Sequence, residues 1–199
     1  MLVRDRMTQP VITVGPRANV SGALKLMFRR KVYRLPVLDE HGRLVGIVTR
    51  GTLLQHGTEE ADPPVEAVMT PTPFTTHPLT PIEQAAVRMR DLRVGALPVL
   101  DQGRLVGIIT ESDIFDAFLE LLGARSDARV TIALTDIAQQ LPRLVTVAAS
   151  TGVRMHGVTA LSNGAGSFAI VSIDHADPNA LVRALHEAGF TSTEAHTRG

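Results

Sequence analysis

The stretch LPVLDQGRLVGIITESD, residues 97–113, decides the fold, because the chain contains it twice. The earlier copy reads LPVLDEHGRLVGIVTRGT at residues 35–52 and is one residue longer. In each copy, two apolar runs flank a turn that contains glycine, which is the pattern of a β-hairpin. Self-similarity at a fixed spacing indicates that one supersecondary unit is built twice.

An amphipathic helix precedes the hairpin in both copies. In the first copy a short strand is predicted at residues 11–14, and Asn19 is placed to cap the helix that follows. In the second copy, apolar residues at helical spacing run from Ile82 to Met89. A further helix follows the second hairpin and is predicted to stop at Gly123. Each copy therefore has the predicted order β-α-β-β-α.

Two such units, each too small to bury its own faces well, are predicted to pack about a pseudo-twofold axis. The order of elements, the Leu-Pro-Val-Leu-Asp segment and the Gly-Ile-Ile-Thr-x-x-Asp stretch at residues 107–113 resemble tandem cystathionine β-synthase (CBS) motifs, a Bateman module. The resemblance covers about residues 1–122. It implies an α/β (α+β) fold with CBS motif 1 at residues 1–60 and CBS motif 2 at residues 61–124.

The end of the second hairpin is the predicted nucleotide site. Thr110 lies between a strand and a helix, so its hydroxyl and the free N–H groups of the first helical turn can converge on a phosphate. Asp113 can accept hydrogen bonds from two vicinal ribose hydroxyls. The resemblance to CBS pairs implies these roles and adds an apolar slot for adenine. The remaining members of the predicted set are Ser112, Ile109, Val94, Leu92, Arg34 and Tyr33.

A purely structural role for Thr110 and Asp113 is the alternative. A threonine cap and an aspartate in the first turn each stabilise a helix by about 1 kcal/mol without any ligand.

The first copy departs from the signature, because Thr52 stands where the second copy has Asp113. A single hydroxyl cannot accept from both ribose hydroxyls as a carboxylate does. A second site, formed by Thr49, Thr52 and Ile47, is therefore predicted to be weaker or empty.

The two copies also differ just before their Leu-Pro segments. The first copy has Tyr33 and Arg34 there, whereas the second has Gly95 and Ala96. The resemblance implies that these loops face each other near the axis. Arg34 is therefore a candidate to reach across and pair with phosphate at the Thr110 site; the alternative is a solvated or structural arginine.

Residues 128–197 read as a different domain, separated from the CBS pair by a boundary at residues 123–127. Strands and helices are predicted there in the order β-α-β-β-α-β, which resembles an ACT domain of ferredoxin-like form. Residues 136–141 read DIAQQL and lack the proline and glycine of the Asp-x-Pro-Gly-x-Leu turn found in amino-acid-binding ACT domains. The absence of this proline and glycine favours dimerisation over amino-acid binding. Gly152, before the second strand, keeps amino-acid binding open as an alternative.

Composition excludes several classes of function. Twenty basic and twenty acidic residues leave no net charge to draw the chain to nucleic acid or a membrane, and no cysteine is present for disulfides or thiolate chemistry. No apolar run approaches the roughly 20 residues that span a bilayer, so a cytoplasmic protein is predicted. The seven histidines show no metal-ligand spacing, no catalytic constellation is evident, and no helix-turn-helix remains once both domains are assigned.

A CBS pair followed by an ACT-like domain is similar to the acetoin-utilisation AcuB type of protein. The resemblance implies a non-catalytic, homodimeric regulator that senses AMP, ADP, ATP or S-adenosylmethionine and acts on carbon or acetoin metabolism, with a protein partner not identified by the sequence. The alternative is a ligand-free scaffold with degenerate CBS motifs and an ACT-like dimer interface.

Overall fold

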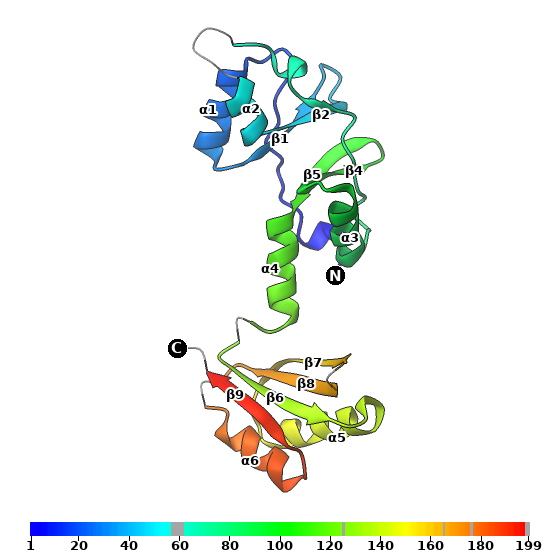
Figure 1. Cartoon of the computed structure of the whole chain (residues 1–199), viewed down its shortest axis with the longest axis vertical. Coiled ribbons are helices and arrows are strands. Elements are labelled where there is room, and N and C mark those ends of the chain that lie inside the picture. The colour runs from blue at the N-terminus through cyan, green and yellow to red at the C-terminus, as the bar shows by residue number, and fades with distance from the viewer. Residues whose placement is uncertain (57–61, 125, 165, 176, 198–199) are drawn as a thin grey trace. The chain divides into compact units, whose positions relative to one another are not determined.

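The computed structural model describes residues 1–56, 62–124, 126–164, 166–175 and 177–197. They belong to two compact units, Met1–Phe115 and Asp116–Gly199 (Figure 1). The limit between the units falls inside one helix, α4. The predicted linker of residues 55–64 lies partly outside the described residues.

The first unit contains both repeats. The first copy consists of α1 (Val20–Arg30), β1 (Arg34–Leu38), β2 (Leu44–Thr49) and α2 (Arg50–His56). The second consists of α3 (Ile82–Leu92), β4 (Ala96–Asp101), β5 (Arg104–Thr110) and α4 (Glu111–Leu121). Short segments η1 (Val3–Asp5), η2 (Val65–Ala67) and β3 (Thr70–Pro71) complete the unit.

The predicted hairpins and helices of both copies are confirmed, since β1 pairs with β2 and β4 with β5, both antiparallel. The strand predicted at residues 11–14 is wrong, because that segment makes a single bridge, from Val14 to Val37.

Each hairpin is extended by the segment that leads into the other copy. Thr8, ahead of the first copy, pairs with Ile108 of β5, and Thr70 of β3 pairs with Ile47 of β2. Glycine at the crossing permits this close approach, because a Cβ added at Gly107 would lie 2.8 Å from the Met7 Cγ atom. Each copy therefore receives a strand segment from the chain that leads into the other copy. This exchange places residues of one copy beside the predicted site of the other.

The apolar stripes that predicted the helices form the core of the unit. In the first copy, side chains from α1, both strands and α2 pack together with Val65 of η2 at 0–1% exposure. They are Val20, Ala23, Met27, Leu35, Val37, Val48, Leu53 and Val65. Burial of one such aliphatic side chain contributes about 1.5–3 kcal/mol, so α2, although short, is held firmly behind the strand end that carries Thr49.

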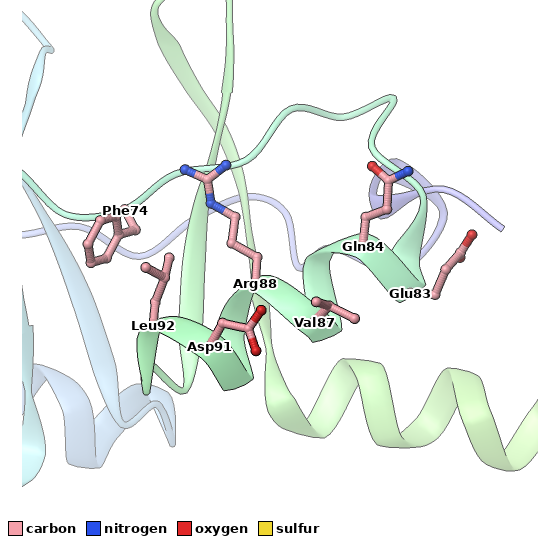
Figure 2. A pocket seen from close by; sticks show the side chains of 7 residues that line it. All are labelled: Phe74, Glu83, Gln84, Val87, Arg88, Asp91 and Leu92. Atoms are coloured by element: carbon pink, nitrogen blue, oxygen red, sulfur yellow. The ribbon is translucent and has the colours of Figure 1, made fainter.

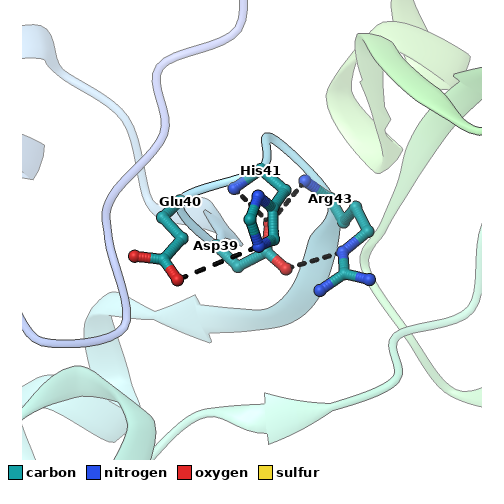
Figure 3. Close-up of polar contacts among 4 residues, drawn as sticks. All are labelled: Asp39, Glu40, His41 and Arg43. Atoms are coloured by element: carbon teal, nitrogen blue, oxygen red, sulfur yellow. Dashed lines mark hydrogen bonds and ion pairs between the residues drawn. The ribbon is translucent and has the colours of Figure 1, made fainter.

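Asp39 holds the turn of the first hairpin (Figure 3). One carboxylate oxygen accepts the backbone N–H groups of His41 and Arg43, both at 2.9 Å, and the other accepts Arg43 Nε at 2.8 Å. These contacts, the Arg43 backbone hydrogen bond first, hold the pKa of Asp39 below its ordinary value.

This lowered pKa predicts a contribution to stability that is complete above the unfolded-state pKa and is lost as the pH falls through the folded-state pKa. Asp39→Asn, which has no proton to take up, is expected to show a smaller fall in thermal midpoint between about pH 5 and pH 2 than the wild type. The matched control is Asp101→Asn, at the equivalent turn of the second hairpin, where Asp101 faces His77 Nε2 at 3.5 Å. If the thermal midpoint of Asp39→Asn fell as much at acid pH as that of the wild type, the interpretation would be contradicted.

The second unit has the predicted order β-α-β-β-α-β. Its elements are β6 (Ala128–Leu134), α5 (Ile137–Ser150), β7 (Met155–Asn163), β8 (Gly166–Ile173), α6 (Asn179–Glu187) and β9 (Ser192–Thr197). The strands form one antiparallel sheet in the order β7-β8-β6-β9. Leu144 of α5 and Leu181 of α6 pack with Val130 and Ile132 of β6 in one core, so both helices cover the same face of the sheet, as Figure 1 shows.

The turn between β6 and α5 satisfies its own backbone groups. The Gln140 side-chain oxygen accepts the N–H groups of Thr135 at 2.7 Å and Asp136 at 3.1 Å, and the Asp136 carboxylate accepts the N–H of Gln139 at 3.1 Å. The backbone N–H groups of Thr135, Asp136 and Gln139 are therefore all engaged within the turn.

No helix in the described part of the chain is long and apolar enough to cross a membrane. Among the same residues, no group of three or more potential ligands is placed to hold a metal ion.

Candidate ligand-binding site

The Thr110–Asp113 pair is built at the junction of β5 and α4. Asp113 lies in the first turn of α4, and its Oδ2 atom accepts the Thr110 N–H at 2.8 Å and the Thr110 hydroxyl at 2.7 Å. Asp113 Oδ1 has no hydrogen-bond partner among the described residues. The strand end thus orients the carboxylate and leaves one oxygen for a ligand.

The first copy has the same turn without a carboxylate. The hydroxyls of Thr49 and Thr52 lie 3.0 Å apart, and the Thr52 N–H donates to the Thr49 hydroxyl at 3.2 Å. The two hydroxyls satisfy each other, so this turn offers a ligand less hydrogen-bonding capacity than the Asp113 turn.

A cavity of about 460 Å³, here called the Thr49 cavity, opens beside the first-copy turn. This volume is in the range of small-molecule sites. Its wall combines residues of β1 and β2, the segment leading into the second copy, the loop between α3 and β4, and the first residue of β4. The lining residues are Arg34, Ile47, Thr49, Thr70, Pro71, Thr72, Pro73, Phe74, Arg93, Val94, Gly95 and Ala96.

The residues predicted to flank adenine do not lie together in the structure. Val94 lines the Thr49 cavity, beside the threonine of the other copy. Leu92 lines a separate groove along the outer face of α3, together with Phe74 and Val87 (Figure 2).

Ile109 does not fit the predicted slot. Its side chain is 0% exposed, and alternation along β5 places it on the face opposite to Thr110. Ile108 occupies the position equivalent to the cavity-lining Ile47, since both pair with the leading segment of the other copy. Ile108 therefore replaces Ile109 in the candidate site.

Arg34 crosses from the first copy to the second. A Cβ added at Gly95 would collide with the Arg34 guanidinium and lie 2.7 Å from Glu111 Oε2. Glycine at position 95 therefore makes room for Arg34 beside the start of α4.

Of the other two predicted residues, Tyr33 has its exposed ring under the Arg50 guanidinium, 4.2 Å from the ring centroid. Ser112 is exposed in the first turn of α4.

Arg93 and the segment from Thr70 to Phe74 line the cavity, although the sequence reasoning missed them. Arg93 ends α3 in the left-handed region, at φ 53°, as Lys31 ends α1 at φ 54°. This repeat of a basic residue at an equivalent helix end was the available signal.

Comparisons with known proteins identify the class that this geometry defines. The family model for the CBS domain matches residues 3–59 and 65–120. The chain therefore belongs to the CBS domain family, with two such domains in tandem.

Solved structures of CBS pairs with bound ligands are similar to this chain. The CBS domain pair of protein MJ0100, in complex with 5′-methylthioadenosine and S-adenosyl-L-methionine, is 32% identical with a TM-score of 0.56, covering 59% of this chain and 95% of that one. CBSX2 in complex with AMP is 34% identical with a TM-score of 0.55, covering 60% and 96%. A Vibrio cholerae protein described as AcuB is 28% identical with a TM-score of 0.56, covering 63% and 95%.

Among curated proteins, L-aspartate semialdehyde sulfurtransferase of Methanocaldococcus jannaschii is 32% identical over 118 residues. The match covers 59% of this chain but only 23% of that enzyme. By contrast, a CBS domain-containing protein of Dictyostelium discoideum, 33% identical, is matched over 94% of its length and 61% of this chain.

Proposed function

We propose that this protein is a non-catalytic, cytoplasmic regulator that binds an adenosine-containing ligand through its CBS pair. The observation that carries the proposal is the Asp113 carboxylate, anchored by Thr110 through one oxygen and open at the other. Similar CBS pairs bound to AMP or to S-adenosylmethionine support AMP, ADP, ATP or S-adenosylmethionine as the ligand.

In the proposed site, the Thr110 hydroxyl orients Asp113, whose open Oδ1 atom accepts the ribose hydroxyls. The positive end of the α4 helix dipole faces a phosphate. Two residues would flank adenine: Ile108, the equivalent of Ile47, and Val32, which follows the left-handed Lys31 at the end of α1 as Val94 follows Arg93 at the end of α3. Arg34 is proposed to contact the phosphate from across the unit.

The C-terminal unit is proposed to be an ACT-like domain that mediates homodimerisation. The engagement of Gln140 with Thr135 and Asp136 supports this role over amino-acid binding, because it uses the N–H groups that a carboxylate ligand would need. A link to acetoin or carbon metabolism, through a protein partner of unknown identity, is proposed on the similarity to AcuB.

Thermal unfolding with AMP, ADP, ATP and S-adenosylmethionine tests the proposal. A ligand at about 100 times its dissociation constant adds about 2.7 kcal/mol to stability. Asp113→Asn, which can still accept the Thr110 hydrogen bonds, is expected to weaken binding roughly 10- to 100-fold, the value of a hydrogen bond to a charged group. Asp101→Asn, a change of the same kind at the far end of the hairpin, is expected to bind as the wild type does.

If no adenosine ligand raises the thermal midpoint of the wild-type protein, the alternative of a ligand-free scaffold is favoured. The CBS pair would then be a scaffold, and the ACT-like unit an oligomer interface whose unfolding midpoint rises with protein concentration.

A further inference from the structure

Another cavity, of about 500 Å³, lies beside the segment that leads into α3, and we call it the Arg88 cavity. It is walled by that segment, by α3 and by Leu100 near the end of β4, and it shares no lining residue with the Thr49 cavity. None of its lining residues is acidic. Its polar lining residues are Thr75, Thr76, His77, Thr80, Gln84 and Arg88.

The internal repeat shows that this polar lining belongs to the second copy alone. The two parallel bridges, Thr76 with Val99 and Val14 with Val37, make Thr76 the equivalent of Val14. The helices α3 and α1 are equivalent as well. The polar set Thr76, Thr80, Gln84 and Arg88 therefore corresponds to Val14, Ala18, Gly22 and Leu26 in the first copy. Because the first copy forms the same elements without these polar side chains, the fold of a copy does not require them.

Thr76 brings an unpartnered hydroxyl to the cavity wall. The residue is only 9% exposed. Its backbone is fully engaged, since its N–H donates to the Pro98 carbonyl oxygen at 3.0 Å and its carbonyl oxygen accepts the Leu100 N–H at 2.9 Å. In the part of the chain that the structure describes, the Thr76 hydroxyl forms no hydrogen bond. A largely buried hydroxyl without a partner is costly, and a ligand in the cavity would satisfy it.

Arg88 supplies a positive charge. Gln84 and Arg88 are four residues apart on α3, so their side chains share a face of the helix. Figure 2 shows the Arg88 guanidinium and the Gln84 amide extending to the same side of α3, away from the Asp91 carboxylate. Among the described residues, Arg88 has neither an ion pair nor a hydrogen bond. Its guanidinium is therefore available to a ligand.

The carboxylates around the cavity do not neutralise Arg88 directly. Asp91 lines the neighbouring groove of α3, and its Oδ1 atom accepts Arg90 Nε at 3.0 Å and Arg90 Nη2 at 2.9 Å. Asp101 does not line the cavity, and its Oδ1 atom lies 3.5 Å from His77 Nε2. A concave wall with a positive charge and no acidic lining residue attracts anions.

We propose that the Arg88 cavity binds a phosphate group, as the free ion or as a small monoester. The Arg88 guanidinium pairs with two phosphate oxygens through parallel N–H groups. The Thr76 hydroxyl and the Gln84 amide donate to the remaining oxygens. The site is separate from the Thr110 turn, so the inference does not rest on the adenosine ligand proposed above.

Amide ¹H–¹⁵N spectra of the full chain, titrated with inorganic phosphate at an ionic strength held constant with chloride, test the proposal. Phosphate is expected to shift the backbone signals of Thr76 and Gln84 and the side-chain Nε–H signal of Arg88. Glycerol 3-phosphate is expected to shift the same signals. The lower of the two dissociation constants then tells whether the site takes the free ion or an ester.

Arg88→Gln is expected to weaken phosphate binding roughly 10- to 100-fold, because it removes a charged, two-pronged contact. Arg88→Lys, which keeps the charge but not the planar fork, is expected to recover part of the affinity. Thr76→Val gives this position the residue found in the first copy, and it is expected to weaken binding by about fivefold or more.

Arg90→Gln is the matched control, because Arg90 is on the same helix but does not line the cavity. It is expected to leave phosphate affinity within about twofold of the wild type. The inference is overturned if phosphate causes no shift beyond that of chloride, or if Arg88→Gln binds phosphate as the wild type does. Shifts confined to Thr110 and the first turn of α4 would also overturn it, because phosphate would then occupy the proposed adenosine site alone.

Discussion

Leu53→Ala is expected to lower the free energy of unfolding of the first unit by about 2–5 kcal/mol. Leu53 lies on α2, is 0% exposed and packs in the core formed by α1 and the first hairpin. Truncation removes its apolar contacts and leaves a cavity that a close-packed interior fills only in part. Urea denaturation followed by Tyr33 fluorescence measures the change, because the sequence has one tyrosine and it lies in this unit.

The neighbouring residue supplies the control. Leu54 is on the same helix and is 56% exposed, so Leu54→Ala makes the same chemical change with little loss of packing, and we expect an effect within about 0.5 kcal/mol. Similar costs for the two variants would mean that α2 does not pack against the core as described. The comparison bears on the site as well, since α2 begins directly after Thr49 and carries Thr52.

The hairpins and helices could be predicted because their signals are local. Apolar residues at helical spacing, glycine at the turns and the repeat itself all act within a few residues. The exchange of leading segments was not predicted. The contacts of Thr8 with Ile108 and of Thr70 with Ile47 join residues far apart in sequence. The sequence signal for this exchange was glycine at positions 46 and 107 inside the strands, because glycine within a strand marks a close approach of another backbone.

The candidate site likewise has a part that local sequence signals predict and a part that depends on long-range contacts. The contact between Thr110 and Asp113 spans three residues and follows from a strand end that runs into a helix. The wall of the cavity depends on the crossing of the two copies, so Arg93 and Thr72 could not be found from their own neighbourhoods. Strand alternation alone would have replaced Ile109 by Ile108, because residues two apart share a face.

Gly123→Ala is expected to cost about 2–4 kcal/mol in the second unit. Gly123 has φ 63°, where an alanine is strained by about 1 kcal/mol. An added Cβ would also collide with the Ser172 hydroxyl and lie 2.5 Å from the Ser172 Cβ. Ser172 is 3% exposed on the central strand β8, so it has little room to move, and overpacking of this kind costs about 1–3 kcal/mol.

Gly189→Ala separates the two causes, because Gly189 has φ 84° in the same unit and an added Cβ would meet no heavy atom within 4 Å. It carries the conformational strain without the collision, so we expect a cost of about 1 kcal/mol. Circular dichroism of the full chain during urea denaturation measures both variants, and Tyr33 fluorescence should stay at the wild-type midpoint because it reports on the first unit. Equal costs would show that Ser172 yields to the added methyl group, and that Gly123 is required for its backbone conformation alone.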